Sequence, residues 1–179
     1  MKFINTNIDG CYIVEYESFY DSRGYFAVPF NRDELMDKLG YPIYFIQDNM
    51  SVSYYGVIRG LHYQRGDYSQ AKLVTCVKGM VLDVAVDIRK DSKTYGEVVR
   101  VELGQKLNRQ LFIPRGCAHG FSVLEEESIF QYKVDNSYNK ESESGIIYND
   151  PTLKIDWLVP EESQKVHERD LSFPEFLSI

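Results

Sequence analysis

A series of short apolar/polar alternations separated by turns restricts the fold of this 179-residue chain more than any other feature. Side chains of a β-strand point alternately to its two faces, so a period of two predicts half-buried strands. The clearest example is 81–88, where one face would carry Leu82, Val84, Val86 and Ile88 and the other Asp83, Ala85 and Asp87. Residues 97–103 repeat it, with Val99, Val101 and Leu103 opposite Val98, Arg100 and Glu102.

Further strand patterns cover 45–53, 57–64, 71–77, 109–113, 119–124 and 128–135. Short strands at this spacing predict a mainly β protein, either a sandwich or a barrel. A helix is expected at 32–39, where Leu35, Met36 and Leu39 share one face and Asn31 can cap the N-terminus. The tail from about 158 is expected to be irregular and packed on the body. No linker-like run interrupts the chain, which predicts one domain over residues 1–179.

Composition excludes several functional classes. The formal net charge of -7, without a Lys/Arg cluster, argues against nucleic-acid binding, because binding requires neutralised phosphates. No stretch approaches the roughly 20 apolar residues of a membrane span. Three widely spaced cysteines and an N-terminus that lacks the apolar core of a signal peptide indicate a reducing compartment, the cytoplasm.

Two histidines and a lysine are the first candidates for chemistry. On an alternating strand His62 shares a face with Ile58, Gly60 and Gln64, opposite Arg59, Leu61 and Tyr63. A histidine on a strand is a structural hydrogen-bonding residue or a catalyst, and the pattern leaves both open. Lys72 precedes an apolar run and either points into the barrel, where it would need an anionic partner, or reaches water at an edge.

Metal binding is a further hypothesis for this region. The spacing Pro114-x-Gly116-x-x-His119 resembles the second motif of cupin barrels. The first motif of metal-binding cupins supplies HxH and a glutamate, whereas here only His62 is present, followed by Tyr63 and Gln64. We therefore predict a cupin-like barrel without a metal.

Arginines could hold an anionic ligand, since the guanidinium suits bidentate phosphate contacts. The candidates are Arg23, Arg59 and Arg115. Tyr132 and Tyr138 lie near a strand end and the loop that follows it, and each could be a packing residue, a general acid or a platform on which a base stacks.

Taken in order, seven segments resemble the dTDP-4-dehydrorhamnose 3,5-epimerase family from about residue 10 to 172. They are DSRGYF (21–26), QDNMSVSYYGVIRGLHYQ (47–64), QAKLV (70–74), KGMVLDVAVDIRKDSKTYG (78–96), FIPRGCAHGFSVL (112–124), FQYKVDNSYNKESESGI (130–146) and NDPTLKIDW (149–157). The combination of RGLHYQ, QAKLV and PRGxAHGF is specific to this family.

The resemblance implies a cupin-type jelly-roll barrel with a few short helices, a homodimer, and an isomerase without metal or cofactor. The implied substrate is a nucleotide-diphosphate deoxysugar, dTDP-4-dehydro-6-deoxy-D-glucose, inverted at carbons 3 and 5 to dTDP-4-dehydro-L-rhamnose. Its 4-keto group acidifies both neighbouring C–H bonds through an enolate, so the reaction needs a base, an acid on the opposite face and a stabilised oxyanion.

By position, the resemblance implies that His62 is the base, Asp170 its orienting carboxylate and Tyr132 the acid, with Lys72 near the enolate oxygen. Substrate contacts are implied for Arg23, Gln47, Asp48, Asn49, Arg59, His119, Tyr138, Glu143 and Arg169. Arg169 stands where the family commonly has lysine.

Val28 departs from the family pattern, which usually has a glutamate near the nucleoside. Either activity is retained or the substrate differs, and a mono-epimerase acting at carbon 3 or carbon 5 alone is the main alternative. A metal-dependent cupin oxygenase and a non-catalytic sugar-nucleotide binder are more distant alternatives.

Overall fold

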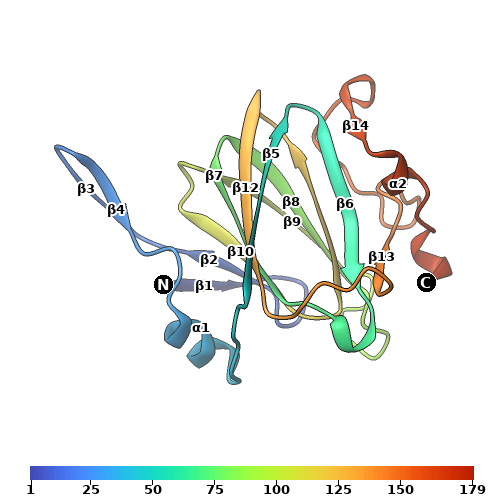
Figure 1. Ribbon diagram of the computed structural model, residues 1–179, viewed down its shortest axis with the longest axis horizontal. Helices are drawn as coiled ribbons and strands as arrows, with labels where there is room; N and C mark the ends of the chain where they lie inside the picture. Colours follow the sequence, from blue (N-terminus) through green and yellow to red (C-terminus); the bar gives the residue numbers. More distant parts are fainter.

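Two antiparallel sheets face each other in the computed structural model of the chain, which describes residues 1–179 (Figure 1). The first sheet has the order β1 (Lys2–Asn5), β2 (Tyr12–Glu15), β10 (Arg109–Ile113), β7 (Lys72–Lys78), β12 (Glu127–Val134) and β5 (Gln47–Tyr54). The second has the order β13 (Glu143–Gly145), β6 (Val57–Gln64), β11 (Cys117–Val123), β8 (Met80–Asp87) and β9 (Val98–Gly104). The predicted mainly β, cupin-type jelly roll is confirmed, and every predicted strand is present with its ends shifted by at most two residues.

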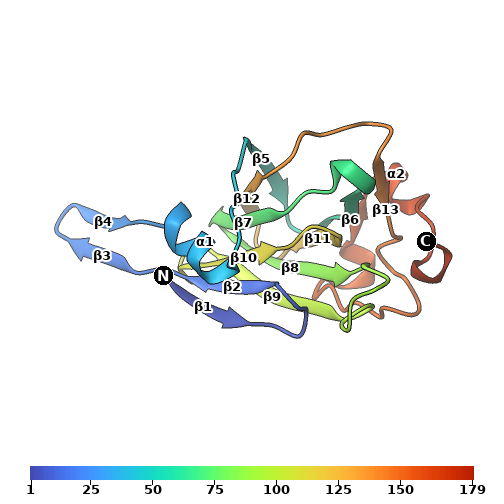
Figure 2. The same ribbon diagram turned by 90° about the horizontal axis from the view of Figure 1, so that it is seen from below.

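The remaining elements are short. A separate hairpin, β3 (Ser18–Asp21) and β4 (Gly24–Ala27), projects away from both sheets, as a second view also shows (Figure 2). The α-helices are α1 (Arg32–Leu39) and α2 (Glu168–Leu171), and 3-10 turns span Gly66–Tyr68, Glu161–Ser163 and Phe176–Ser178. Neither α-helix has the length and apolarity needed to cross a bilayer.

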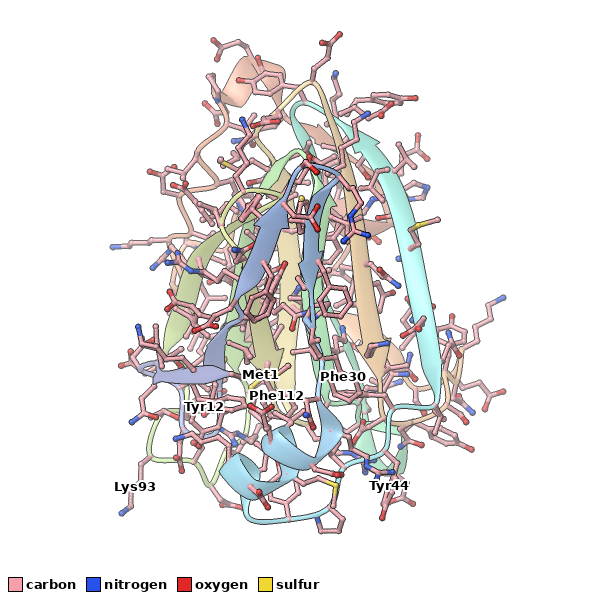
Figure 3. The ribbon with its side chains drawn as sticks, turned by 90° about the vertical axis from the view of Figure 1, so that its left-hand side faces the viewer. Met1, Tyr12, Phe30, Tyr44, Lys93 and Phe112 are labelled. Carbon is pink, nitrogen blue, oxygen red and sulfur yellow. The ribbon has the colours of Figure 1, made fainter.

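Helix α1 forms where the sequence predicts it. The Asn31 side chain accepts hydrogen bonds from the backbone N–H groups of Asp33 and Glu34, and Gly40 ends the helix in the left-handed conformation. Leu35 packs under the first sheet in a cluster with Leu73 and Phe112. Figure 3 shows this end of the molecule, with Tyr12 and Phe112 between the strands and the helix.

The main core lies between the two sheets. Phe130 from the first sheet stacks on Phe121 from the second, with ring centroids 4.2 Å apart. Around them pack aliphatic side chains from both inner faces, among them Val74, Leu111, Val99, Val101 and Leu103. Burial of these apolar surfaces stabilises the sandwich.

A second core covers the outer face of the second sheet. Leu82, Val84 and Val86 of β8 pack there against Leu153, Trp157 and Phe176 from the C-terminal part of the chain. Strand β8 is therefore buried on both faces, and the prediction of a half-buried strand is wrong for it. The tail is packed on the body as predicted, but it is not wholly irregular, because β14 (Lys165–Val166) pairs in parallel with β6 and α2 follows it.

The alternation predicted for β6 is also wrong. Arg59 lines the same pocket as His62, while Ile58 and Leu61 both pack in the outer core. The β6–β11 pairing is irregular at this point, where Gly60 has a φ of +125°. A β-carbon on Gly60 would lie 2.5 Å from Cα of Gly120, so only glycine allows the two strands to approach so closely.

Asp87 anchors the turn between β8 and β9. It is fully buried and accepts hydrogen bonds from Arg89 Nε at 2.8 Å, Ser92 Oγ at 2.7 Å and Thr94 Oγ1 at 2.7 Å. Burial alone would raise the pKa of Asp87, but these hydrogen bonds outweigh it and lower the pKa to about 2.

We predict that Asp87→Asn lowers the free energy of unfolding at pH 7 by about 2 kcal/mol, because Arg89 loses its anionic partner. A depressed pKa stabilises the fold above the unfolded value of about 3.9, and this contribution is lost as pH falls through about 2. The stability difference between the wild type and the variant should therefore narrow below about pH 4. Urea denaturation of both proteins between pH 2 and pH 7 measures this difference. Equal stability of the wild type and Asp87→Asn at pH 7 would contradict the prediction.

Candidate active site

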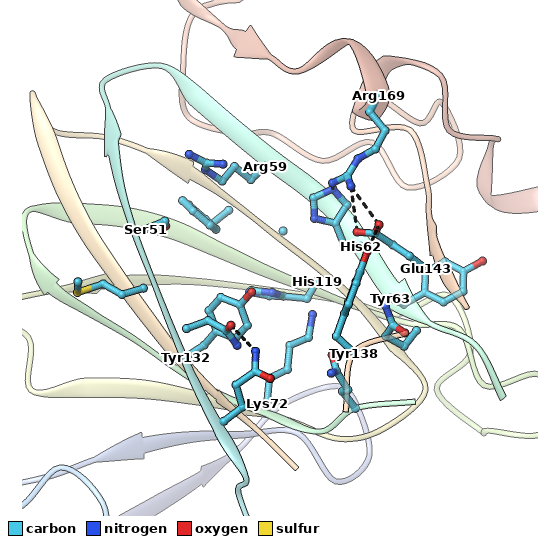
Figure 4. A pocket seen from close by; sticks show the side chains of 17 residues that line it. Ser51, Arg59, His62, Tyr63, Lys72, His119, Tyr132, Tyr138, Glu143 and Arg169 are labelled. Atoms are coloured by element: carbon cyan, nitrogen blue, oxygen red, sulfur yellow. Dashed lines mark hydrogen bonds and ion pairs between the residues drawn. The ribbon is translucent and has the colours of Figure 1, made fainter. Parts of the chain in front are cut away.

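A pocket of about 630 Å³ opens between the two sheets at the β5–β6 side of the sandwich (Figure 4). Ten of the residues predicted for the site line it: Gln47, Asn49, Arg59, His62, Lys72, His119, Tyr132, Tyr138, Glu143 and Arg169. Both sheets contribute, so the pocket exists only once they face each other.

His62 on β6 pairs with a carboxylate from the C-terminal helix. Its Nε2 lies 2.9 Å from Oδ1 of Asp170, and Asp170 is 2% exposed. The other oxygen of Asp170 accepts the backbone N–H of Gly60 at 3.1 Å. Burial would raise the pKa of Asp170, but the hydrogen bonds from His62 and Gly60 lower it, so Asp170 stays ionised. A neutral His62 then donates from Nε2 and keeps Nδ1 free to accept a proton.

Arg169 connects this pair to the rim of the pocket. Its Nη1 lies 3.1 Å from both carboxylate oxygens of Glu143, and its Nε lies 3.4 Å from Oδ1 of Asp170, the partner of His62. Glu143 in turn accepts the hydroxyl of Tyr138 at 3.0 Å. The side chains implied as substrate contacts thus form one chain of polar contacts from the rim to His62.

Lys72 enters the pocket from β7 and is 8% exposed. Its ammonium lies 5.9 Å from the ring centroid of Tyr132. Burial lowers the pKa of Lys72 to about 8, although Asp83 and Glu143 act in the opposite direction. The sequence left the direction of this side chain open, and it points inward.

His119 on β11 is buried beside Lys72 (Figure 4). Its Nε2 lies 2.8 Å from Oδ1 of Asp83, and its ring stacks on Phe130. Burial lowers the pKa of His119 more than Asp83 raises it, so the ring is neutral. Its Nε2–H donates to Asp83, which leaves Nδ1 as an acceptor.

Tyr132 on β12 belongs to the sheet opposite His62. Burial raises the pKa of Tyr132, and Arg59 acts against the rise. Tyr132 therefore keeps its proton at neutral pH. The pocket has a proton acceptor on one wall and a proton donor on the other.

Three residues named from sequence lie elsewhere. Arg23 sits at the tip of the β3–β4 hairpin, where it pairs with Asp21. Asp48 points outward from β5 and pairs with Lys133, while its neighbours Gln47 and Asn49 face the pocket. Arg115 pairs with Asp135. Val28 is also outside the pocket, in a separate hollow near the N-terminus.

Sequence reasoning missed several residues of the site. Gln64, Gln70 and Phe121 line the pocket, and Phe173 packs edge-on against His62. Asp83, the partner of His119, was visible only as a polar position on the face of 81–88 opposite Leu82, Val84 and Val86, and nothing in the local pattern indicated what it pairs with. No group of three or more His, Cys, Asp or Glu side chains converges in a way that could hold a metal ion.

The chain is similar in sequence and fold to proteins of one family. The sequence model of one family, dTDP-4-dehydrorhamnose 3,5-epimerase, matches residues 5–178. The Shigella flexneri protein of that name is 45% identical over 99% of this chain and 97% of its own length. The crystal structure of the Elizabethkingia anophelis epimerase has a TM-score of 0.96 and 47% identity, covering 99% of this chain and 97% of its own.

A second solved structure contains a ligand. The Legionella pneumophila 3,5-epimerase, in complex with dTDP-4-keto-L-rhamnose, has a TM-score of 0.94 and 43% identity. It covers 99% of this chain and 94% of its own.

The burial of Lys72 leads to a prediction that can be tested without substrate. Amine labelling of the native protein as a function of pH, read by peptide mass spectrometry, should give Lys72 a midpoint near pH 8, against about 10.4 for an ordinary lysine. The same labelling in denaturant is the control, and there the midpoint should return to the ordinary value. A native midpoint near 10 would contradict the buried position of the ammonium.

Proposed function

The chain belongs to the dTDP-4-dehydrorhamnose 3,5-epimerase family, and we propose that the pocket between its sheets performs that family's proton transfers with His62 as the base. The protein is an isomerase that epimerises dTDP-4-dehydro-6-deoxy-D-glucose at carbons 3 and 5 to dTDP-4-dehydro-L-rhamnose. The observation that carries the proposal is the His62–Asp170 pair on one wall of the pocket opposite Tyr132 on the other.

The first step is removal of a proton next to the 4-keto group. Nδ1 of His62 accepts the proton from carbon 3 or carbon 5, and the electron pair of the broken C–H bond moves into an enolate. The ring becomes an imidazolium, whose positive charge the ionised Asp170 stabilises at 2.9 Å. Asp170 also fixes the tautomer in which Nδ1 is free.

The enolate oxygen needs a nearby positive charge. Lys72 supplies a protonated ammonium in a region from which water is largely excluded, where electrostatic stabilisation is strongest. Because its pKa lies near 8, this stabilisation weakens as pH rises through that value.

The second step returns a proton to the opposite face of the ring. Tyr132 is protonated at neutral pH and stands on the other sheet, so it donates from the side away from His62. The carbon is thereby inverted. The same two groups act at carbons 3 and 5 in turn.

The remaining lining residues suit the nucleotide diphosphate. Arg59 is held by a hydrogen bond from its Nε to Ser53 at 3.1 Å and offers a fork-shaped cation for phosphate oxygens. Gln47 and Asn49 lie at the outer end of β5, and Tyr138 presents a half-exposed ring at the rim on which a base can stack.

Arg23 requires a second subunit if it binds the diphosphate. It lies on the hairpin rather than in the pocket of its own chain, and the hairpin exposes the apolar side chains Phe19, Tyr20, Tyr25 and Phe26. We propose a homodimer in which the hairpin packs on the partner and delivers Arg23 to the partner's pocket. We further propose that residues 1–179 act as one domain in the cytoplasm, where the three free cysteines would stay reduced.

Proton NMR of dTDP-4-dehydro-6-deoxy-D-glucose in deuterated buffer with protein and chelator tests the reaction. Deuterium should enter at both carbon 3 and carbon 5, because each proton passes through a group that exchanges with solvent. Exchange at one carbon alone would show a mono-epimerase and contradict the double reaction.

Two variants separate the roles of base and acid in the same assay. His62→Ala should slow exchange at both carbons by about 10²–10⁴-fold. Tyr132→Phe should still exchange but invert slowly, because His62 returns the deuteron to the face from which it took the proton. A Tyr132→Phe protein that inverts at the wild-type rate would exclude Tyr132 as the acid.

Mixed dimers test the role of Arg23. Arg23→Ala and His62→Ala should each be weakly active at low substrate concentration. When the two variants are unfolded and refolded together in equal amounts, about half of the dimers should be mixed. Each mixed dimer has one complete pocket out of two, so roughly a quarter of the wild-type activity should return. If the mixture shows only the average of the two variants, Arg23 does not act across the interface.

A further inference from the structure

Asp83 is a buried carboxylate with one oxygen that has no hydrogen-bond partner. It lies on the inner face of β8, fully shielded from solvent, and Oδ1 accepts the Nε2–H of His119. No hydrogen-bond donor reaches Oδ2. An ionised carboxylate in such a place is costly unless a cation compensates its charge.

Lys72 is the cation that faces it. Both side chains point between the sheets, Lys72 from β7 and Asp83 from β8, and the neutral ring of His119 lies beside them. Among the groups that interact electrostatically with Lys72, Asp83 has the largest favourable effect on its charge.

The other neighbours of Lys72 cannot serve as its counter-ion. Glu143 already pairs with Arg169 and accepts the hydroxyl of Tyr138. Burial raises the pKa of the Cys117 thiol, so it is neutral, and Tyr132 and His119 are neutral as well. Asp83 is thus the one carboxylate near Lys72 that no cation already pairs with.

We propose that Asp83 is a positioning residue that keeps Lys72 protonated and, by accepting the Nε2–H of His119, fixes the tautomer in which Nδ1 of His119 is free. It acts through these two side chains and does not touch the substrate, because His119 lies between Asp83 and the pocket. The proposal rests on the proposed function in taking Lys72 as the group that stabilises the enolate.

Asp83→Asn tests the proposal, since the amide keeps the shape and can still accept from His119 but removes the negative charge. Asp87→Asn is the matched control. It removes a buried carboxylate from the same face of the same strand, where the partners are Arg89, Ser92 and Thr94 and not the pocket. Both variants are checked for folding by thermal denaturation.

The first measurement is amine labelling of Lys72 against pH in the absence of substrate. In Asp83→Asn its midpoint should move down by about one pH unit, as expected when an opposite charge is lost in a partly desolvated site. In Asp87→Asn it should stay at the wild-type value. An unmoved midpoint in Asp83→Asn, or equal shifts in the two variants, would overturn the proposal.

The second measurement is kcat/KM against pH, which reports groups that titrate in the free enzyme. With the pKa of Lys72 shifted by about one unit, kcat/KM of Asp83→Asn should fall about fivefold at pH 8 and change little at pH 6. A uniform loss at every pH would show that Asp83 is only structural, and would overturn the proposal.

The labelling needs no catalysis, so failure of this proposal can be told apart from failure of the proposed function. If the wild type exchanges no deuterium into the substrate, the function fails whatever Lys72 does. If the wild type exchanges deuterium normally but the labelling midpoint of Lys72 is the same in Asp83→Asn as in the wild type, only the role proposed for Asp83 fails.

Discussion

The site depends on the hydrogen bonds of the Asp170 carboxylate, because they connect the C-terminal segment of the chain to the middle of β6. The carboxylate accepts from both His62 and the backbone of Gly60. Helix α2, which carries Asp170, is flanked by two anchors: β14 pairs with β6 before it, and Phe176 is buried in the outer core after it. The C-terminal segment is therefore part of the active site as well as a cover for the second sheet. Its docking fixes the tautomer and orientation of His62, the proposed base.

The interior of the sandwich holds buried carboxylates among its apolar side chains. On the inner face of β8, Ala85 packs in the core while Asp83 and Asp87 on either side of it are buried with polar partners. Each carboxylate has a distinct function in this arrangement. Asp87 anchors a turn, whereas Asp83 binds His119, which lines the pocket, in a region where weak screening strengthens the electrostatic effect of every nearby charge. The same low dielectric that makes these groups costly to bury would strengthen the proposed effect of Lys72 on an enolate.

Much of the fold could be predicted from the sequence, because alternation is a local property that each strand carries in its own residues. The prediction was wrong for β6, where Gly60 against Gly120 shifts the pairing and turns Arg59 to the same side as His62. It was also wrong for β8, whose outer face is covered by residues far along the chain. Asp170 could be named only through resemblance to a family, since the polar sequence around it has no pattern that indicates a functional residue. Asp48 was named in the same way and Arg23 also as a candidate cation, and both lie outside the pocket of their own chain.

The sequence by itself determined the strands, the helix α1 with its Asn31 cap and the supply of proton-transfer groups, because these depend on the period and type of neighbouring residues. Only the tertiary structure decided which groups meet. His62 and Asp170 are separated by 108 positions, and His119 and Asp83 by 36. Such pairs form when strands of different register face each other and the tail closes over the sheet. The protonation of Lys72 likewise depends on its burial, which is a property of the assembled sheets rather than of the segment QAKLV.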